Sequence, residues 1–445
     1  MTSEIISLLG VFIGLIVMII MAWKGVPIMF VGIFVALVTG LFSGMNVMDL
    51  MANSYMAGFA GFAQRYWLIF MFSAIFGKLL SESGAARVLA LKCAGIARKF
   101  PGKEKLVAVW SMTLLAGILC YGGISLFVLV FTLVSISRDL YQELDIPWHL
   151  YMFQGLTSGA IILCMSPGSP QIHNIIPTTY LGTTPMAAPI LSIIMMISAF
   201  IMGHFYLVWT LKKSEMKNEG FYPSGSLIAK AELGYGNANE IPNHNVFLCL
   251  LPSIILLITM NGFGFSAVTS LILANIATFI IFFKDLMPAN KLKKVIGEAC
   301  ASAFTAVGGT CAVVGFGAVV AAVPAFNLVL NSLDQIPGPP IVQLILAVNA
   351  AAGITGSGSG GLTIAMDSLS QRFLASGIPP EVIHRMASVS CCGLDSLPHN
   401  GANLNRIFVC RLSFKEAYGH IFVTNLVIPV ICAIIGAVVY SFGIW

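Results

Sequence analysis

Long runs of apolar residues with almost no charge make up most of this chain. The first twenty residues, MTSEIISLLGVFIGLIVMII, contain a single charged side chain. A helix of about 20 apolar residues is long enough to cross a bilayer. Hydrophobic residues make up 58% of the chain and charged residues only 9%, whereas soluble domains carry about 25% charged residues. Because so apolar a chain could not cover its surface in water, the sequence predicts an all-α polytopic membrane protein.

The apolar segments fall into two halves separated by residues 211–243, the longest polar stretch, which we expect to be a cytoplasmic linker. The first segment has no basic residues before it and no small-residue cleavage site, so we interpret it as a span and not as a signal peptide. The candidate segments are 5–22, 26–43, 60–80, 106–119, 125–137, 148–165 and 186–210 in the first half, and 245–260, 264–283, 299–320, 340–353, 361–375, 380–394 and 419–442 in the second.

Basic residues indicate how the chain is oriented, because cytoplasmic loops of membrane proteins carry an excess of Lys and Arg. Basic clusters within 83–105, 212–230, 284–294 and 406–415 can all be cytoplasmic only if the chain starts outside, and residues 295–371 contain no Lys or Arg. We therefore expect a multi-pass protein of the cell (inner) membrane with both termini outside. The net charge of +5 then reflects topology, and no nucleic-acid partner is expected.

Two pairs of short apolar segments occupy corresponding places in the two halves. Each segment is about 13–15 residues long, and small polar tips join them, CYGGIS (120–125) and GITGSGSGG (353–361). Short, glycine-interrupted segments at matching positions are typical of a transporter binding site. We interpret the pairs as re-entrant hairpins, an inner one at 104–138 and an outer one at 338–376. The alternative is twelve or more ordinary spans with glycine-rich packing faces.

The order of segments repeats along the chain. Each half contains two spans, a third span, an arm, a hairpin, a broken span and a last span. Without the hairpins, about ten transmembrane helices remain, five in each half, and an odd number per half inverts the second copy. The expected fold is therefore two inverted repeats with about ten transmembrane helices, two re-entrant hairpins and two broken helices.

Two polar stretches interrupt the spans that follow the hairpins, MSPGSPQIHN (165–174) and LDSLPHNG (394–401). A break in a spanning helix frees N–H and C=O groups that lipid cannot satisfy. The half-helix that restarts after a break presents a partially positive N-terminus, which favours an anion, and the carbonyls left behind favour a cation. We expect the two tips and the two breaks to meet at the midplane in one site for an anionic substrate and a coupling cation.

Asp395 is the strongest single candidate. An ionisable side chain at membrane depth costs at least about 2.5 kcal/mol and is functional by default, unless the break surfaces in a loop. We expect Asp395, His399 and His173 to couple ion movement, although His173 also suits a satisfied core histidine. H+ is favoured over Na+ because histidine titrates near neutral pH. The candidate substrate-binding residues are Tyr121, Gly122, Gly123, Ser125, Ser169, Gln171, Asn174, Thr355, Ser357, Gly358, Ser359, Ser396 and Asn400.

Other function classes have weaker support. The sequence contains no Walker motif, dinucleotide-binding motif or nucleophile elbow, so we expect ion-coupled transport and no enzyme activity, cofactor or metal. A passive channel with the same hairpins is one alternative. A membrane-embedded enzyme would need Ser396 and His399 as nucleophile and base. The ten cysteines show no metal-ligand spacing, and we interpret them as small buried apolar residues without a redox role.

Two stretches, FGKLLSESGAA (76–86) and GLDSLPHNGA (393–402), resemble signatures of the gluconate permease family of the ion transporter superfamily. The resemblance implies a gluconate:H+ symporter, or a relative for another hydroxy-monocarboxylate such as 3-hydroxybutyrate. Helix N-termini, hydroxyls and amides can hold a monocarboxylate without an arginine clamp. A sodium-coupled carboxylate transporter of another substrate class is the alternative. The run NLNRIFVCRL (403–412) departs from the family pattern, which has Val, Ile and Leu there, and this departure bears on the substrate.

The resemblance also implies a homodimer in which a transport domain moves like an elevator against a scaffold. The scaffold would comprise residues 1–59, 186–283 and the final span at 419–445. The transport domain would comprise residues 60–185, with the inner hairpin, and 284–418, with the outer hairpin.

Overall fold

The computed structural model describes residues 2–121, 126–230, 243–287, 291–326, 328 and 338–445. Every regular element in these ranges is a helix, so the prediction of an all-α fold is confirmed. The inverted repeat and the number of spans remain predictions. Among the described residues, six helical stretches are long and apolar enough to cross a membrane, namely Glu4–Ala22, Val47–Leu80, Glu104–Tyr121, Pro189–Met216, Lys291–Ala322 and Phe414–Ser441.

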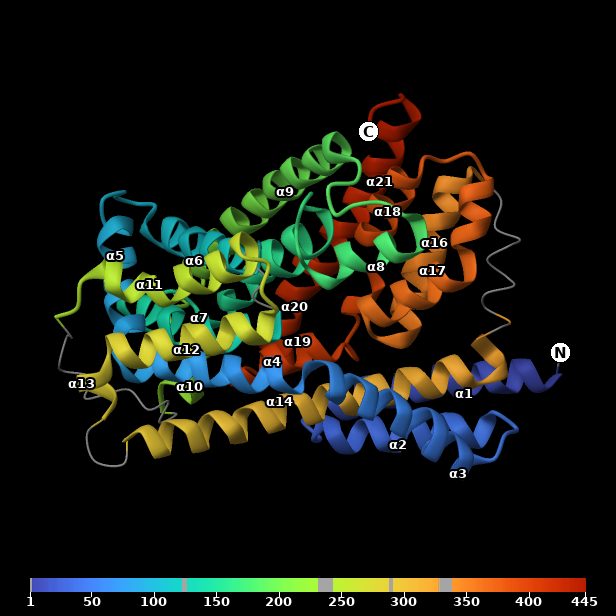
Figure 1. Cartoon of the computed structure of the whole chain (residues 1–445), viewed down its shortest axis with the longest axis horizontal. Coiled ribbons are helices and arrows are strands. Elements are labelled where there is room, and N and C mark those ends of the chain that lie inside the picture. The colour runs from blue at the N-terminus through green and yellow to red at the C-terminus, as the bar shows by residue number, and fades with distance from the viewer. Residues whose placement is uncertain (1, 122–125, 231–242, 288–290, 327, 329–337) are drawn as a thin grey trace.

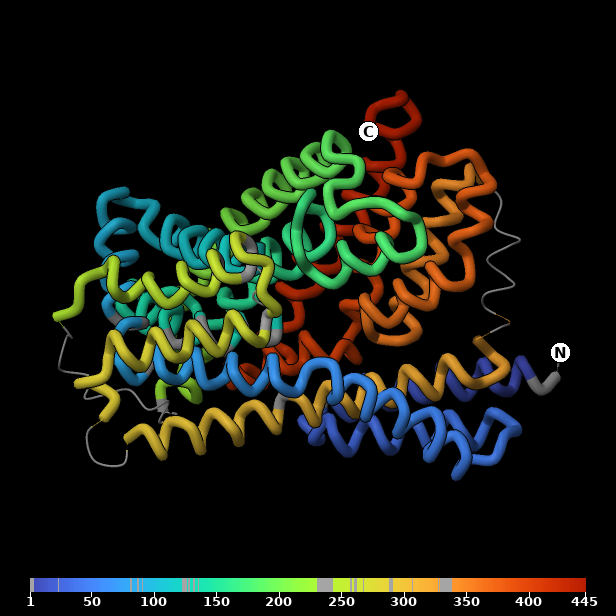
Figure 2. The backbone as a smooth tube through the Cα atoms, viewed as in Figure 1, coloured from blue at the N-terminus to red at the C-terminus, as the bar shows by residue number. Residues whose placement is uncertain are grey.

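One layer of the molecule combines the first helices with a long helix from the second half. Helix α14 packs along α4 and α2, and α1 packs on α2, so these helices lie along the longest axis in Figures 1 and 2. As the third span of each half, α4 and α14 hold corresponding places in the sequence, and here they are neighbours. The bounds are α1 Thr2–Trp23, α2 Ile28–Phe42, α3 Val47–Asp49, η1 Leu50–Tyr55, α4 Met56–Glu82 and α14 Lys291–Ala322.

The two predicted hairpins are pairs of helices that pack against each other. The inner pair is α6 (Glu104–Tyr121) and α7 (Leu126–Glu143), and the outer pair is α16 (Pro340–Thr355) and α17 (Gly358–Ala375). These helices are 16 to 18 residues long, so the predicted segment lengths were too short. Because α6 is itself long enough to cross a membrane, the re-entrant character of the inner pair stays a prediction.

Both predicted helix breaks are present. The first broken helix consists of the 3₁₀-helix η2, the π-helix η3 and, after residues 166–171, the helix α8. The second consists of α18, a short 3₁₀ turn η5 and α19. Helix α8 packs against both α17 and α18, which brings the two breaks and the outer hairpin together. The bounds are η2 Trp148–Gln154, η3 Leu156–Met165, α8 Ile172–Leu181, α18 Pro380–Ser390, η5 Leu394–Ser396 and α19 Gly401–Val409.

The remaining helices complete the body. Helix α9 extends into the predicted linker, and α5 follows α4 directly. The final span contains a π-helical segment, η6. In Figure 1 both termini lie away from α5, α10 and α13, which belong to three of the basic segments predicted to be cytoplasmic. The fourth, 406–415, covers the end of α19 and the start of α20 in the middle of the molecule, and its Arg406 is buried, so the prediction was wrong for that residue. The bounds are α5 Ala85–Ala97, α9 Pro189–Met216, α10 Ser226–Lys230, α11 Val246–Leu257, η4 Ile258–Gly262, α12 Ala267–Ile281, α13 Phe283–Leu286, α20 Phe414–Ile421, η6 Phe422–Val427 and α21 Ile428–Ser441.

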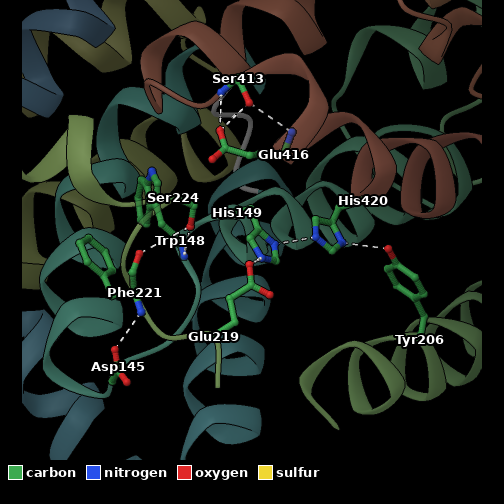
Figure 3. A network of polar contacts seen from close by, with 10 residues as sticks. All are labelled: Asp145, Trp148, His149, Tyr206, Glu219, Phe221, Ser224, Ser413, Glu416 and His420. Atoms are coloured by element: carbon green, nitrogen blue, oxygen red, sulfur yellow. Dashed lines mark hydrogen bonds and ion pairs between the residues drawn. The ribbon is translucent and has the colours of Figure 1, made fainter. Parts of the chain in front are cut away.

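The first part of the predicted linker is packed and hydrogen-bonded, as Figure 3 shows. Glu219 Oε1 lies 3.0 Å from His149 Nε2, and His149 Nδ1 lies 2.8 Å from His420 Nε2. Tyr206 Oη lies 2.8 Å from His420 Nδ1. The Phe221 N–H donates to Asp145 Oδ1 over 2.8 Å. These contacts tie the linker to α9, to the start of the first broken helix and to α20.

Candidate functional site

A cavity of about 240 Å³ lies where the outer hairpin and the two helix breaks meet α4 and α14. Its volume suits a small organic molecule. Asp395 is the only acidic residue among the described lining residues, and none of them is Lys or Arg. The polar residues of the wall are Tyr66, Ser73, Gln171, His173, Thr310, Ser357, Ser359, Asp395, Ser396, Asn400, Asn403 and Asn425.

Gly358, the first residue of α17, is the point where three predicted elements converge. A Cβ atom at Gly358 would lie 2.6 Å from His173 Cε1 and 2.8 Å from Asp395 Oδ2, so only glycine leaves room for both side chains. His173 belongs to the first break and Asp395 to the second. The N-terminus of a helix is partially positive, and here it faces the Asp395 carboxyl group, which is only 7% exposed.

The tip of the outer hairpin is organised by its own hydroxyl groups. Gly356 has a φ of +62°, a left-handed conformation that glycine adopts without strain. The Ser357 side chain caps α17 by accepting from the Gly360 N–H over 3.2 Å. Ser359 also lines the cavity. Thr355 instead donates to the Ala351 carbonyl within α16 and lines a neighbouring cavity of about 330 Å³.

Residues of the second break divide between the cavity wall and the support behind it. Ser396 and Asn400 line the cavity. The Asn400 side chain caps α19 by accepting from the Asn403 N–H over 2.8 Å, and its amide donates to the Gly356 carbonyl over 3.3 Å. His399 does not line the cavity; its Nε2 lies 2.8 Å from the Gly353 carbonyl oxygen. His399 therefore holds the hairpin tip against the break.

Most residues of the first break, 165–174, do not line the cavity. Gln171 lines the cavity, and its amide donates to the Cys120 carbonyl over 2.6 Å, which joins this break to the inner hairpin. Asn174 is fully buried and donates to the carbonyls of Ser169 and Pro185 over 2.8 and 3.0 Å. Ser169 and Asn174 are thus part of the framework of the break and do not line the cavity.

Tyr121, at the end of α6, lies outside the cavity wall. Its side chain is 43% exposed, and its hydroxyl donates to the Pro167 carbonyl over 3.3 Å. The predicted substrate-binding residues Gly122, Gly123 and Ser125 lie outside the described residues.

Arg385 on α18 holds the first break in shape. It is completely buried, and its guanidinium donates to the carbonyls of Cys164, Pro185 and Ala187 over 3.1 to 3.3 Å. A break leaves carbonyls without intrahelical partners, and a buried guanidinium has five N–H donors to supply. The arginine therefore satisfies the Cys164 carbonyl just before the break and two carbonyls of the segment between α8 and α9.

Cys164 and Cys392 lie just before the two breaks and are joined by a disulfide. The interpretation of all ten cysteines as unpaired apolar residues was therefore wrong for this pair. His173 Nδ1 lies 3.3 Å from the Cys164 sulfur and 3.4 Å from the Cys392 sulfur. With Cys391, these residues place their sulfur and ring-nitrogen atoms within 4.8 Å of one another. The two disulfide sulfurs are not thiolates, which are the form of cysteine that binds metals. Residues 228 positions apart in sequence meet only through the tertiary fold, so spacing in the sequence gave no sign of this group.

Several residues of the cavity wall were not among the sequence candidates. Asn403 and Asn425 line it, as do Thr310 of α14 and Tyr66 of α4. Asn403 had been noticed only as a departure from the family pattern. Asn425 lies in the π-helix η6, and π-helical segments are frequent at functional sites, but a π-helix leaves no clear mark in a single sequence.

Comparison with known proteins places the chain among transporters. The family model described as GntP family permease matches residues 5–259. The uncharacterized transporter YxjC of Bacillus subtilis (strain 168) is 30% identical over 422 residues, which cover 86% of this chain and 88% of that protein. The crystal structure of the Alcanivorax borkumensis YdaH transporter is similar with a TM-score of 0.40 and 14% identity over 89% of each chain. The family model and the relative from Bacillus show that this chain belongs to the GntP family of permeases.

Proposed function

We propose that this permease is a cation-coupled symporter for a small organic anion, namely a hydroxy-monocarboxylate such as gluconate or 3-hydroxybutyrate. The proposal rests on the cavity between the two breaks and the outer hairpin. Asp395, its only described acidic lining residue, faces the N-terminus of α17 beside His173. An ionisable residue at membrane depth is a mark of ion and substrate pathways.

Asp395 is the residue we assign to the coupling ion, with His173 as its neighbour across Gly358. H+ is the favoured ion because a carboxyl group and an imidazole both bind protons, and because histidine titrates near neutral pH. Na+ is the second candidate, since Ser357 and Ser396 place hydroxyl oxygens at the same wall. His399 acts in this proposal through the hairpin tip that it supports.

The walls of the cavity supply the groups that a hydroxy acid needs. Ser357, Ser359, Gln171 and Asn400 offer hydroxyls and amides to the substrate's hydroxyl groups. We infer further that the protein works as a homodimer in the cell membrane with both termini outside. Its transport domain, residues 60–185 and 284–418, would move like an elevator against the scaffold.

Uptake by proteoliposomes tests the proposal. Purified protein is reconstituted, and uptake of labelled gluconate and 3-hydroxybutyrate is measured under an inward proton gradient, an inward sodium gradient and neither. The proposal expects uphill accumulation with one of the two gradients. Uptake that only equilibrates in all three conditions would identify a passive facilitator, and conductance in planar bilayers would identify a channel.

A further inference from the structure

Arg406, in the last turn of α19, is a buried cation with unused donors. The residue is only 2% exposed. Its Nη2 donates to Asn403 Oδ1 over 3.0 Å, whereas Nε and Nη1 have no hydrogen-bond partner. No ion pair in the described part of the chain includes Arg406. A guanidinium stays charged in proteins, and a buried charge without a counter-ion is strongly destabilising.

The guanidinium lies directly behind the cavity wall. A Cβ atom at Gly155 would collide with Arg406 Nη1 and would lie 2.5 Å from Asn425 Oδ1, so the guanidinium and the Asn425 amide both rest on this glycine. Asn425 and Asn403 line the cavity. The charge therefore lies one side chain away from the space that a substrate would occupy.

The position of Asp395 indicates which part of the cavity is free for a carboxylate. The N-terminus of α17 already faces the Asp395 carboxyl group at Gly358, so a second carboxylate there would be repelled. The N-terminus of α19 is different, because Gly401 and Ala402 line the cavity and the three atoms nearest to a Cβ built at Gly401 belong to Thr310 and Val313, not to a carboxyl group. The first N–H groups of a helix have no intrahelical partner and bind anions readily.

We propose that the substrate carboxylate binds at the N-terminus of α19, and that Arg406 is the fixed cation that makes this end of the cavity selective for it, acting through Asn403 and Asn425. This inference rests on the proposed transport of an organic anion and names the residue that recognises its charge. The substrate carboxylate supplies the counter-ion that no described residue provides for Arg406. Arg406 is a positioning and selectivity residue, since the two asparagines stand between it and the cavity.

A comparison of a carboxylate with its amide tests the role of the charge. Uptake of 3-hydroxybutyrate and competition by 3-hydroxybutyramide are measured for the wild type, Arg406→Gln and Arg406→Lys. The control is Arg372→Gln, which removes an arginine in the last turn of α17, at the end opposite Gly358. Arg406→Gln should raise the carboxylate KM about tenfold or more, because it removes an attraction in a medium of low dielectric. It should leave inhibition by the amide nearly unchanged. Arg406→Lys should restore part of the preference, and Arg372→Gln should match the wild type.

Asn403→Asp is a second variant that does not remove the arginine. It places a carboxylate about 3 Å from Arg406 Nη2, where the Asn403 oxygen now accepts a hydrogen bond, and so supplies an internal counter-ion. We expect a melting temperature at or above that of the wild type together with a carboxylate KM that is about tenfold higher. The unchanged fold would separate loss of recognition from loss of structure.

The outcomes distinguish this inference from the proposed function. Wild-type protein that accumulates no organic anion under any gradient would overturn the proposed function. Wild-type protein that accumulates 3-hydroxybutyrate, with Arg406→Gln and Asn403→Asp both keeping the wild-type preference for the acid over the amide, would overturn the role of Arg406 and leave the proposed function standing. If Arg406→Gln does not fold, the KM of Asn403→Asp decides alone.

Discussion

The two helix breaks are alike in sequence, since each contains proline and a His-Asn pair, but their polar groups serve different purposes. In the first break, Asn174 donates to the carbonyls of Ser169 and Pro185, and Arg385 donates to the Cys164 carbonyl just before the break. Both breaks contribute side chains to the cavity wall, Gln171 and His173 from the first and Asp395, Ser396 and Asn400 from the second, but only the second contributes a carboxyl group.

The difference follows from the neighbours of each break. The first break lies against α18, which carries a buried arginine with several donors. Both breaks reach the N-terminus of α17 at Gly358, where the first break places the His173 ring and the second the Asp395 carboxyl group. A helix break is therefore a source of unpaired polar groups, and the packing around it decides whether they stabilise the fold or remain available to a ligand.

The largest expected effect comes from removing the charge of the second break. Asp395→Asn should reduce gradient-driven uptake to the background of empty liposomes, because the side chain can no longer bind or release the coupling ion. The melting temperature should change little, since an amide fits the same space. The measurement is uptake under the active gradient, with counterflow exchange as a parallel assay. Undiminished gradient-driven uptake would show that Asp395 is not the coupling residue.

The corresponding change in the first break should affect folding instead. Arg385→Met removes the donor that Arg385 supplies to the carbonyls of Cys164 and Ala187, whereas the Pro185 carbonyl still accepts from the Gly168 N–H and from Asn174. Each unsatisfied buried group costs about 1–3 kcal/mol. We expect a loss of about 3 kcal/mol or more in stability, measured by thermal unfolding in detergent. A variant as stable as the wild type would mean that the first break does not depend on this arginine.

The disulfide connects the two breaks and offers a third test. Cys164→Ala should lower stability by about 2–4 kcal/mol, the usual contribution of a disulfide. It should also leave the acid-over-amide preference in place, because neither cysteine lines the cavity. Cys432→Ala, at a buried unpaired cysteine, is the control for loss of a sulfur atom. Equal unfolding temperatures for the two variants would contradict a stabilising role of the disulfide.

The smallest expected effects come from the asparagines of the two His-Asn pairs. Asn174→Ala should cost about 1–3 kcal/mol of stability, because the buried Ser169 carbonyl loses its side-chain donor, and should change the KM little. The Pro185 carbonyl keeps the Gly168 N–H and Arg385 as donors. Asn400→Ala removes the cap of α19, which costs about 1 kcal/mol, and should also raise the KM, since Asn400 lines the cavity. Equal effects of the two variants on the KM would erase the distinction between the breaks.

Residues in the second break were easier to predict than those in the first. Asp395, Ser396 and Asn400 stand in a polar stretch inside an apolar segment, and all of them reach the cavity wall. Of the predicted site residues in the second break, only His399 does not line it, whereas in the equivalent stretch of the first break Gln171 and His173 line the cavity and Ser169 and Asn174 do not. The sequence pattern is the same in both cases, because it records only that a helix is interrupted and not which partners satisfy the interruption.

The sequence alone determined that this protein is helical, lies in a membrane, and has two breaks and two hairpin-like pairs in its helices. These properties follow from hydrophobicity, glycine and proline, which act over a few residues of the chain. The tertiary structure alone decided that Arg385 donates to backbone carbonyls, whereas Nε and Nη1 of Arg406 have no hydrogen-bond partner. It also decided that Asn425 reaches the cavity and that Cys164 meets Cys392. The reason is physical, since the role of a buried polar group depends on partners that lie far away in the sequence and come near only when the helices pack.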